Sequence, residues 1–322
     1  MARQRPVVFA NRAGQRLFGI LHEPEIAQPD RPAVILLSPG VKMRVGPQRL
    51  YRRMAEQFVA AGLTLLRFDF YGLGDSEGEL TEELLRDVYN HIEVGRFVDD
   101  TLDAMNWLQA ETGHRTFILS GLCGGAITGL LTGARDARVV GLLGLGITPL
   151  LASRSADPSL YMTRGQLESI GKTYLQKLTN PRAWLRLLTL KSDYRLLWRS
   201  VVRTAKPVEP ATAAPPPSEP DNASPLFPPA FFEMTRSSRP MLLVFGGSDR
   251  LHFEFEEKFV ARHRAQLAER PDAYDVHVVE KANHVLSADA WQAEMLAVSA
   301  RWLDRHFLGA RAGAAPAAAA RH

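Results

Sequence analysis

The sequence predicts an α/β fold in which helices flank a mostly parallel central sheet, and two observations lead to this prediction. First, short and almost wholly apolar runs recur along the chain, as in strands that are buried on both faces of a sheet. Second, segments with apolar residues at helical spacing separate these runs, which is typical of strand, helix, strand crossovers in a parallel sheet. We therefore expect strands and helices to alternate over most of the 322 residues.

The N-terminal half of the chain contains the clearest alternation. Residues 33–38, AVILLS, and residues 63–70, LTLLRFDF, are the apolar runs that predict the first two buried strands. Between them, apolar side chains at helical spacing predict a helix over residues 49–61. The other elements predicted in this half are a strand at 17–23, a helix at about 94–112, and strands at 116–120 and 139–146.

This alternation stops after residue 146 and resumes near residue 240. Residues 150–202 carry Leu, Tyr and Trp at helical spacing, and residues 206–229 are the part of the chain that is densest in proline, which disrupts helices and strands. We therefore expect a helical lid at residues 149–238, with a flexible loop at about 206–229. The core, residues 1–148 and 239–308, is completed by strands at 240–245 and 275–279 and helices at 253–269 and 289–307, and the Ala-rich tail 309–322 is expected to be disordered.

Composition and charge exclude several classes of protein. With 46% hydrophobic and 23% charged residues, the chain is neither collagen-like, nor a coiled coil, nor disordered throughout. Its 39 Lys and Arg and its 35 Asp and Glu are scattered without a basic block, so we expect no nucleic acid partner. No apolar stretch reaches the roughly 18 residues of a transmembrane segment. The single cysteine cannot form an intramolecular disulfide, so we expect a cytoplasmic location.

A glycine-rich turn places this cysteine between a predicted strand and a predicted helix. The strand at 116–120 runs into Gly121-Leu122-Cys123-Gly124-Gly125, after which apolar residues return at helical spacing. A nucleophile elbow needs this pattern, because glycines on both sides let the strained turn avoid the neighbouring strand and helix. The helix N-terminus would also favour a thiolate and a developing oxyanion. The alternative is a buried cysteine that packs as a small apolar side chain.

Two further polar residues follow later strands of the predicted sheet. Asp249 comes after the strand at 240–245, and His284 comes after the strand at 275–279. The chain order of nucleophile, acid and base at the carboxyl ends of successive strands is typical of a catalytic triad on this kind of sheet. A lone Asp in a turn is often a local cap and a lone His is often a surface or core residue, so the hypothesis depends on order and strand context together.

Several motifs make the chain resemble the α/β-hydrolases of the serine aminopeptidase-like group, and more narrowly the hydrolases associated with bacterial exosortase and exopolysaccharide gene clusters. These motifs are MRVG at 43–46, RFDFYGLGDSEG at 67–78, the elbow, YLQ at 174–176 and FGGSD at 245–249. The broad family usually has Ser where this sequence has Cys123, and many relatives have a His-Gly turn where it has Ser38-Pro39-Gly40. The resemblance implies an α/β-hydrolase fold.

The resemblance also implies roles for individual residues. Cys123 would be the nucleophile, His284 the general base and then the general acid, and Asp249 the residue that orients the imidazole. The backbone amides of Gly124 and Val41 would donate to the oxyanion, although the Pro-Gly pair before Val41 would form a turn in any case.

These observations predict a hydrolase that cleaves a carboxylic ester or thioester, with a small-molecule or carrier-bound acyl substrate, through an acyl-cysteine intermediate. We expect no cofactor and no metal, because the sequence has no metal-ligand spacing and no phosphate loop. The Gly-rich segment 71–78 is interpreted as structural, with Asp69 and Ser76 tying the turn together. Two alternatives stay open: an acyltransferase to a sugar, amine or carrier, and a catalytically inactive binding protein with a hydrolase fold. The oligomeric state also stays open.

Overall fold

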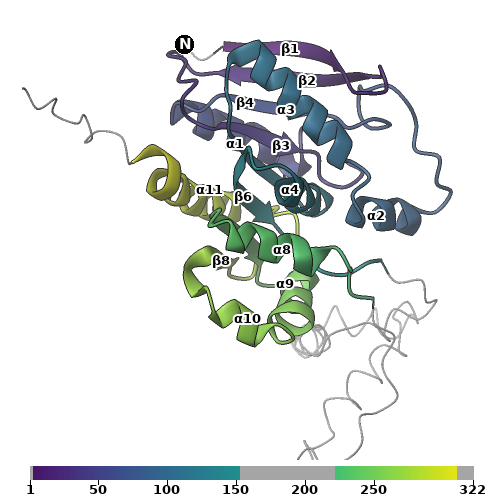
Figure 1. The fold of residues 1–322 in the computed structure, drawn as a ribbon, viewed down its shortest axis with the longest axis vertical. Coiled ribbons are helices and arrows are strands. Elements are labelled where there is room, and N and C mark those ends of the chain that lie inside the picture. The colour runs from purple at the N-terminus through teal and green to yellow at the C-terminus, as the bar shows by residue number, and fades with distance from the viewer. Residues whose placement is uncertain (1–2, 153–221, 310–322) are drawn as a thin grey trace, which may run out of the picture.

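A computed structural model describes residues 3–152 and 222–309 of the chain, and its centre is an eight-stranded sheet (Figure 1). The strand order is β1-β2-β4-β3-β5-β6-β7-β8, and all neighbours from β4 onward are parallel, whereas β2 is antiparallel to β1 and to β4. The prediction of a mostly parallel sheet is thus confirmed. The strands are β1 (Arg3–Ala10), β2 (Arg16–Glu23), β3 (Ala33–Leu37), β4 (Leu65–Phe68), β5 (Phe117–Leu122), β6 (Val139–Leu145), β7 (Met241–Gly246) and β8 (Tyr274–Val279).

Every residue of the central strands β3, β4, β5 and β7 is buried, which explains why these segments were recognisable as apolar runs. The strand β1 was not predicted. It lies at the edge of the sheet and alternates exposed with buried side chains at its C-terminal end, so it lacks a continuous apolar run.

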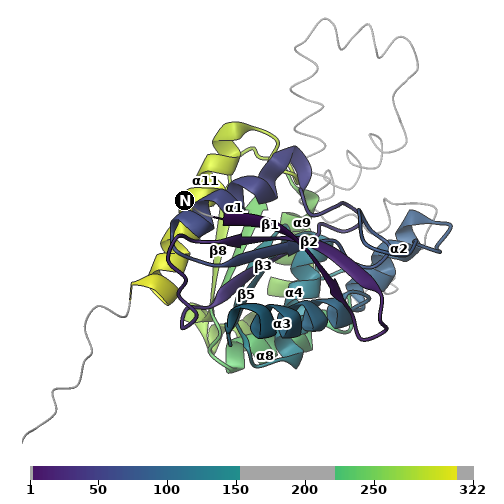
Figure 2. The same cartoon turned by 90° about the horizontal axis from the view of Figure 1, so that it is seen from above.

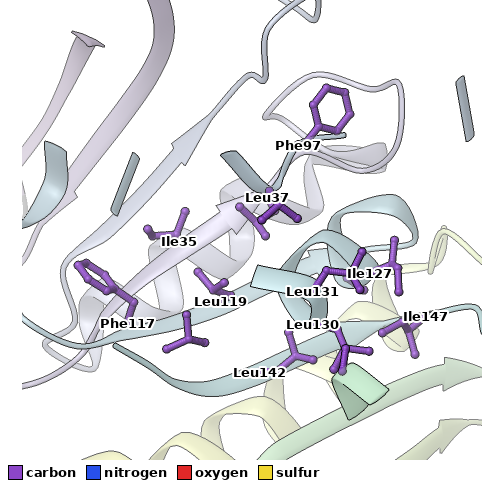
Figure 3. Packing of buried hydrophobic residues seen from close by; sticks show 14 of the residues in the cluster. Ile35, Leu37, Phe97, Phe117, Leu119, Ile127, Leu130, Leu131, Leu142 and Ile147 are labelled. Carbon is purple, nitrogen blue, oxygen red and sulfur yellow. The ribbon is translucent and has the colours of Figure 1, made fainter. Parts of the chain in front are cut away.

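Helices cover both faces of the sheet, as Figure 2 shows. On one face lie α1 (Leu50–Ala60) and α11 (Asp289–Leu303), and on the other lie α3 (Val98–Thr112), α4 (Gly124–Arg135) and α8 (Phe227–Arg236). The central helix of the second face is α4, whose Ile127, Leu130 and Leu131 pack in the same core as Leu119 and Leu142 of the strands beneath (Figure 3). This packing fixes the N-terminus of α4 at the carboxyl edge of the sheet.

Helix α8 lies within the range 149–238 that was assigned to the lid, but the structure places it in the core. Its Phe227 and Phe231 are fully buried and pack edge-on or tilted against Phe255 and Phe259. The prolines at its start occupy the first turn, where a helix tolerates them. Residues 153–221 of the predicted lid and residues 310–322 of the predicted disordered tail lie outside the described residues.

Two helical regions differ from the prediction. The helix α2 (Leu85–Glu93) was not expected, and the single helix predicted at 253–269 consists of short segments.

None of the helices in the described ranges is long and apolar enough to cross a membrane. The remaining segments are α9 (Arg250–Glu254), a π-helical turn at Phe255–Val260, α10 (Arg264–Ala268), a second π-helical turn at Asp304–Leu308, and 3-10 turns at Pro47–Arg49 and Pro271–Ala273.

Candidate active site

Cys123 occupies a tight turn between β5 and α4, with φ 55° and ψ −116°. Such a positive φ is strained for a residue with a side chain, so neighbouring contacts must hold it. The two flanking glycines allow this, because a Cβ added to Gly121 would lie 2.5 Å from the carbonyl carbon of Gly125, and one added to Gly125 would lie 2.4 Å from the Leu37 carbonyl oxygen. The turn therefore has the strand, elbow and helix geometry that the sequence predicts.

Two backbone amides next to this turn have no acceptor. Gly124 is the first residue of α4, and within residues 3–152 and 222–309 neither its N–H nor that of Val41 donates to a protein acceptor. The segments that carry them are in contact, because a Cβ added to Gly124 would lie 2.9 Å from the Cα of Gly40. Free amides at a helix N-terminus favour a nearby anion.

The structure brings His284 together with Asp249 and Cys123. The His284 Nδ1 lies 2.8 Å from Asp249 Oδ2, while Asp249 Oδ1 accepts a hydrogen bond from the Leu251 N–H. The Asp249 side chain is 3% exposed and the His284 side chain 35% exposed, so the ring has one open side. Burial opposes the charged ring, but hydrogen bonds to Asp249 and Cys123 and the negative charges of both outweigh it and raise the pKa of His284 to about 10. His284 is therefore an imidazolium at neutral pH.

Backbone contacts explain why Asp249 and His284 meet. The strands β7 and β8 are parallel neighbours, so the loops after them leave the same edge of the sheet. These loops are joined by hydrogen bonds from the Gly247 N–H to the Val279 carbonyl and from the Ser248 N–H to the Ala282 carbonyl. They are so close that a Cβ added to Gly246 would lie 2.5 Å from the Ala282 carbonyl oxygen.

Gly146, directly after β6, contacts the same pair of side chains and was missed by the sequence analysis. Its φ is 52°, and an added Cβ would lie 3.0 Å from His284 Cε1 and 3.2 Å from Asp249 Oδ2. A side chain at this position would push against the imidazole. The only signal in the sequence is a glycine at the carboxyl end of a predicted strand, which does not indicate what it contacts.

A fully buried tyrosine links the elbow to the strand that precedes Val41. The Tyr51 hydroxyl donates to the Leu37 carbonyl at 2.7 Å and accepts from the Leu122 N–H at 2.7 Å. Burial raises the pKa of Tyr51 far above its ordinary value, so the hydroxyl stays a donor. The ends of β3 and β5 are thereby held in fixed register beside Cys123.

The loop that follows Val41 is anchored by an arginine. Arg44 forms ion pairs with the buried Asp69 and with Asp75, and its backbone N–H also donates to Asp69 Oδ1. The predicted role of Asp69 and Ser76 is confirmed, because the Ser76 hydroxyl donates to the Asp69 carbonyl at 2.6 Å. The sequence analysis missed Arg44 as their partner. No signal within the segment 67–78 points to a residue some 25 positions earlier.

Helix α2 adds two titratable side chains near the site, the phenol of Tyr89 and the carboxyl of Glu93. The sequence analysis also missed these two residues. Tyr89 is half-buried, and Glu93 is 7% exposed and accepts a hydrogen bond from the Ala152 N–H at 2.9 Å. Burial raises the pKa of Glu93 to about 8, and the charge of Glu254 adds to this effect. Glu254 in turn accepts a hydrogen bond from the Thr148 hydroxyl. Because this pKa lies above 7, Glu93 is mostly protonated at neutral pH.

Over the part of the chain that the structure describes, no three His, Cys, Asp or Glu side chains gather in the way that a metal ion requires. The expectation that the protein uses no metal and no cofactor stays a prediction.

Comparison with known proteins points to one family. The sequence profile described as "Alpha/beta hydrolase family" matches residues 34–298, whereas no curated protein has a significantly similar sequence. Among solved structures, the chain is similar to the Pyrococcus furiosus esterase Pf2001, with 16% identity, a TM-score of 0.57, and coverage of 94% of this chain and 91% of that one. It is also similar to a dienelactone hydrolase from Anabaena variabilis, with 15% identity, a TM-score of 0.53, and coverage of 95% and 99%. A hypothetical protein from Pseudomonas aeruginosa has 18% identity, a TM-score of 0.56, and coverage of 95% and 94%.

Proposed function

Because the chain belongs to the alpha/beta hydrolase family, we propose that it is a cofactor-independent cytoplasmic hydrolase that cleaves a carboxylic ester or thioester through an acyl-cysteine intermediate. One observation carries the proposal. Cys123 stands in a strained elbow at a helix N-terminus, beside His284, whose ring is hydrogen-bonded to Asp249. A cytoplasmic location would keep this single thiol reduced.

In the first step, the Cys123 sulfur attacks the acyl carbonyl carbon. His284 carries the proton that it later gives to the leaving group, and its positive charge stabilises the attacking sulfur. The negative charge that develops on the carbonyl oxygen would be met by the free amides of Gly124 and Val41. When the intermediate collapses, the bond to the leaving oxygen or sulfur breaks and His284 gives its proton to the departing alcohol or thiol.

In the second step, water attacks the thioester carbonyl carbon while His284 accepts a proton from that water. The bond to the Cys123 sulfur breaks, the carboxylic acid leaves, and the thiolate and imidazolium are restored. Asp249 holds Nδ1 throughout, which leaves Nε2 free for the proton transfers. Esters and thioesters suit this cycle better than amides, because an amine leaves readily only when it is protonated.

We further propose that the chain belongs to the narrower serine aminopeptidase-like group, among the hydrolases associated with exosortase and exopolysaccharide gene clusters. The contacts of two quoted motifs support this, since Arg44 of MRVG pairs with Asp69 and Asp75 of the segment 67–78. In such a setting, a small-molecule or carrier-bound acyl group is the expected substrate.

The test compares wild type, Cys123→Ala and Cys123→Ser on p-nitrophenyl butyrate and butyryl-CoA. We expect wild-type turnover, one butyryl group on Cys123 in a quenched sample by mass spectrometry, and neither in Cys123→Ala. Cys123→Ser should keep the fold and change the rate, because a hydroxyl is far less acidic than a thiol. Turnover that survives in Cys123→Ala would refute the nucleophile. Butyryl transfer to an added alcohol or amine in place of water would favour an acyltransferase, and a folded wild type that is never acylated would favour a binding protein.

A further inference from the structure

Tyr89 of α2 lies against the turn that presents the Val41 amide. A Cβ added to Gly40 would lie 2.9 Å from Tyr89 Cε1 and 3.1 Å from its phenolic oxygen. Gly40 directly precedes Val41, and the same residue also contacts Gly124, as described above. The phenol therefore stands beside the segment that carries the Val41 amide and contacts Gly124.

The hydroxyl of Tyr89 has no partner of its own. Within the described ranges 3–152 and 222–309, no side chain or backbone group forms a hydrogen bond with it, whereas the hydroxyl of Tyr51 forms two. Tyr89 is also only partly buried, so a ligand can reach it. A phenol that is held rigidly by its ring but unpaired at its hydroxyl is suited to bind a ligand oxygen.

The electrostatics of the site favour a neutral phenol here. Burial raises the pKa of Tyr89, and the negative charge of Cys123 adds to that effect. Tyr89 is thus protonated at neutral pH and can donate a hydrogen bond while a negative charge develops on the carbonyl oxygen of the substrate.

We propose that Tyr89 is a further catalytic residue, whose hydroxyl donates to the acyl oxygen alongside the amides of Gly124 and Val41. This inference rests on the proposed function. A side-chain donor in this position stabilises the oxyanion in the transition state more than the neutral carbonyl in the ground state, so its loss lowers the rate of acylation. The proposed ligand group is the carbonyl oxygen of an ester or thioester.

The test separates two reactions of the same thiol. Acylation of Cys123 by p-nitrophenyl acetate passes through an oxyanion, whereas alkylation by iodoacetamide displaces iodide without one. Tyr89→Phe keeps the ring that packs on Gly40 and removes only the hydroxyl. We expect acylation to slow about 10- to 100-fold in this variant, while alkylation stays at about the wild-type rate.

Tyr274→Phe is the matched control, because Tyr274 is also a half-buried phenol with a raised pKa but begins β8, at the opposite end of the strand from His284. Both of its reactions should match wild type. If Tyr89→Phe is acylated at the wild-type rate, or if its acylation and alkylation rates fall by the same factor, the role at the oxyanion is overturned while the proposed function stays intact. A wild type that is alkylated but not acylated would overturn the proposed function and this inference together.

Discussion

On the acid–base side of the site, the loops at 246–249 and 279–284 are joined by backbone hydrogen bonds, whereas on the oxyanion side the segment 37–46 is held to its neighbours by side chains. The first pair of loops is linked through Gly247 and Ser248. The segment on the oxyanion side depends on Tyr51 and on the ion pairs of Arg44. Backbone bonds form with almost any side chain, while a buried ion pair needs both partners. Substitutions on the acid–base side should therefore affect chemistry alone, and those on the oxyanion side should affect folding and chemistry together.

The largest expected effect is the loss of turnover in His284→Ala. Removal of the imidazole leaves no group to protonate the leaving group or to activate water, so turnover should fall by about a thousandfold or more. The fold should be retained, because the backbone bonds between the two loops remain. Steady-state hydrolysis of p-nitrophenyl butyrate and circular dichroism measure the two properties.

The matched control for His284→Ala is His277→Ala, since His277 is equally half-buried but lies on β8, where it pairs with Glu294. Its turnover should equal that of wild type. Alkylation of Cys123 by iodoacetamide at neutral pH should also slow in His284→Ala but not in the control, because the imidazole of His284, unlike that of His277, lies beside the sulfur. Equal alkylation rates in both variants would contradict the acid–base side as described.

The second prediction breaks the oxyanion side through its buried ion pair. Asp69 is 0% exposed and Arg44 15% exposed, so Asp69→Ala leaves a largely buried guanidinium with only its bond to Asp75. We expect the free energy of unfolding to fall by about 3 kcal/mol and activity to fall with it. Urea denaturation and ester hydrolysis measure both effects.

Asp75→Ala removes the exposed partner of the same arginine and serves as the control. The Asp75 side chain is 58% exposed, so its loss should cost less than about 1 kcal/mol. Equal destabilisation by the two substitutions would show that burial does not distinguish the two ion pairs of Arg44.

The smallest expected effect concerns Glu93, a buried carboxyl that accepts a hydrogen bond from the Ala152 N–H. Its pKa rises from 4.5 to about 8 on folding. Below about pH 4.5, Glu93 is protonated in both the folded and the unfolded chain, and the protein has the full stability that this group contributes. As pH rises from 4.5 toward 8, the unfolded chain releases the proton while the folded protein still holds it, so this stability is lost. Glu93→Gln cannot ionise and should lack this slope.

Urea denaturation at pH 5, 6, 7 and 8 measures that difference. Relative to Glu93→Gln, wild type should lose about 1–3 kcal/mol across the range. The exposed Glu56→Gln is the control, and its profile should follow that of wild type. A wild type that gains stability over Glu93→Gln as pH rises would contradict a protonated Glu93.

Several features could be predicted from the sequence because they depend on neighbours along the chain. The apolar runs that became β3, β4, β5 and β7 are buried on both faces, so they carry no polar alternation to obscure them. The elbow at Cys123 is likewise local, since the glycines that permit its geometry lie within two residues of it. The positions of Asp249 and His284 at the edge of the sheet followed from chain order, because the carboxyl ends of parallel strands meet at one edge.

Only the tertiary structure decided which residues surround these groups. Phe227 and Phe231 could have lined a lid, but Phe255 and Phe259 pack against them and draw α8 into the core. The contacts of Gly146 with His284, of Arg44 with Asp69 and of Tyr89 with Gly40 join residues that are distant in the sequence. Hydrophobic periodicity records how much of each segment is buried, but it carries no information on which segment covers it. The sequence therefore determined the strands, the elbow and the order of the polar residues, and the packing of the sheet and its helices determined their partners.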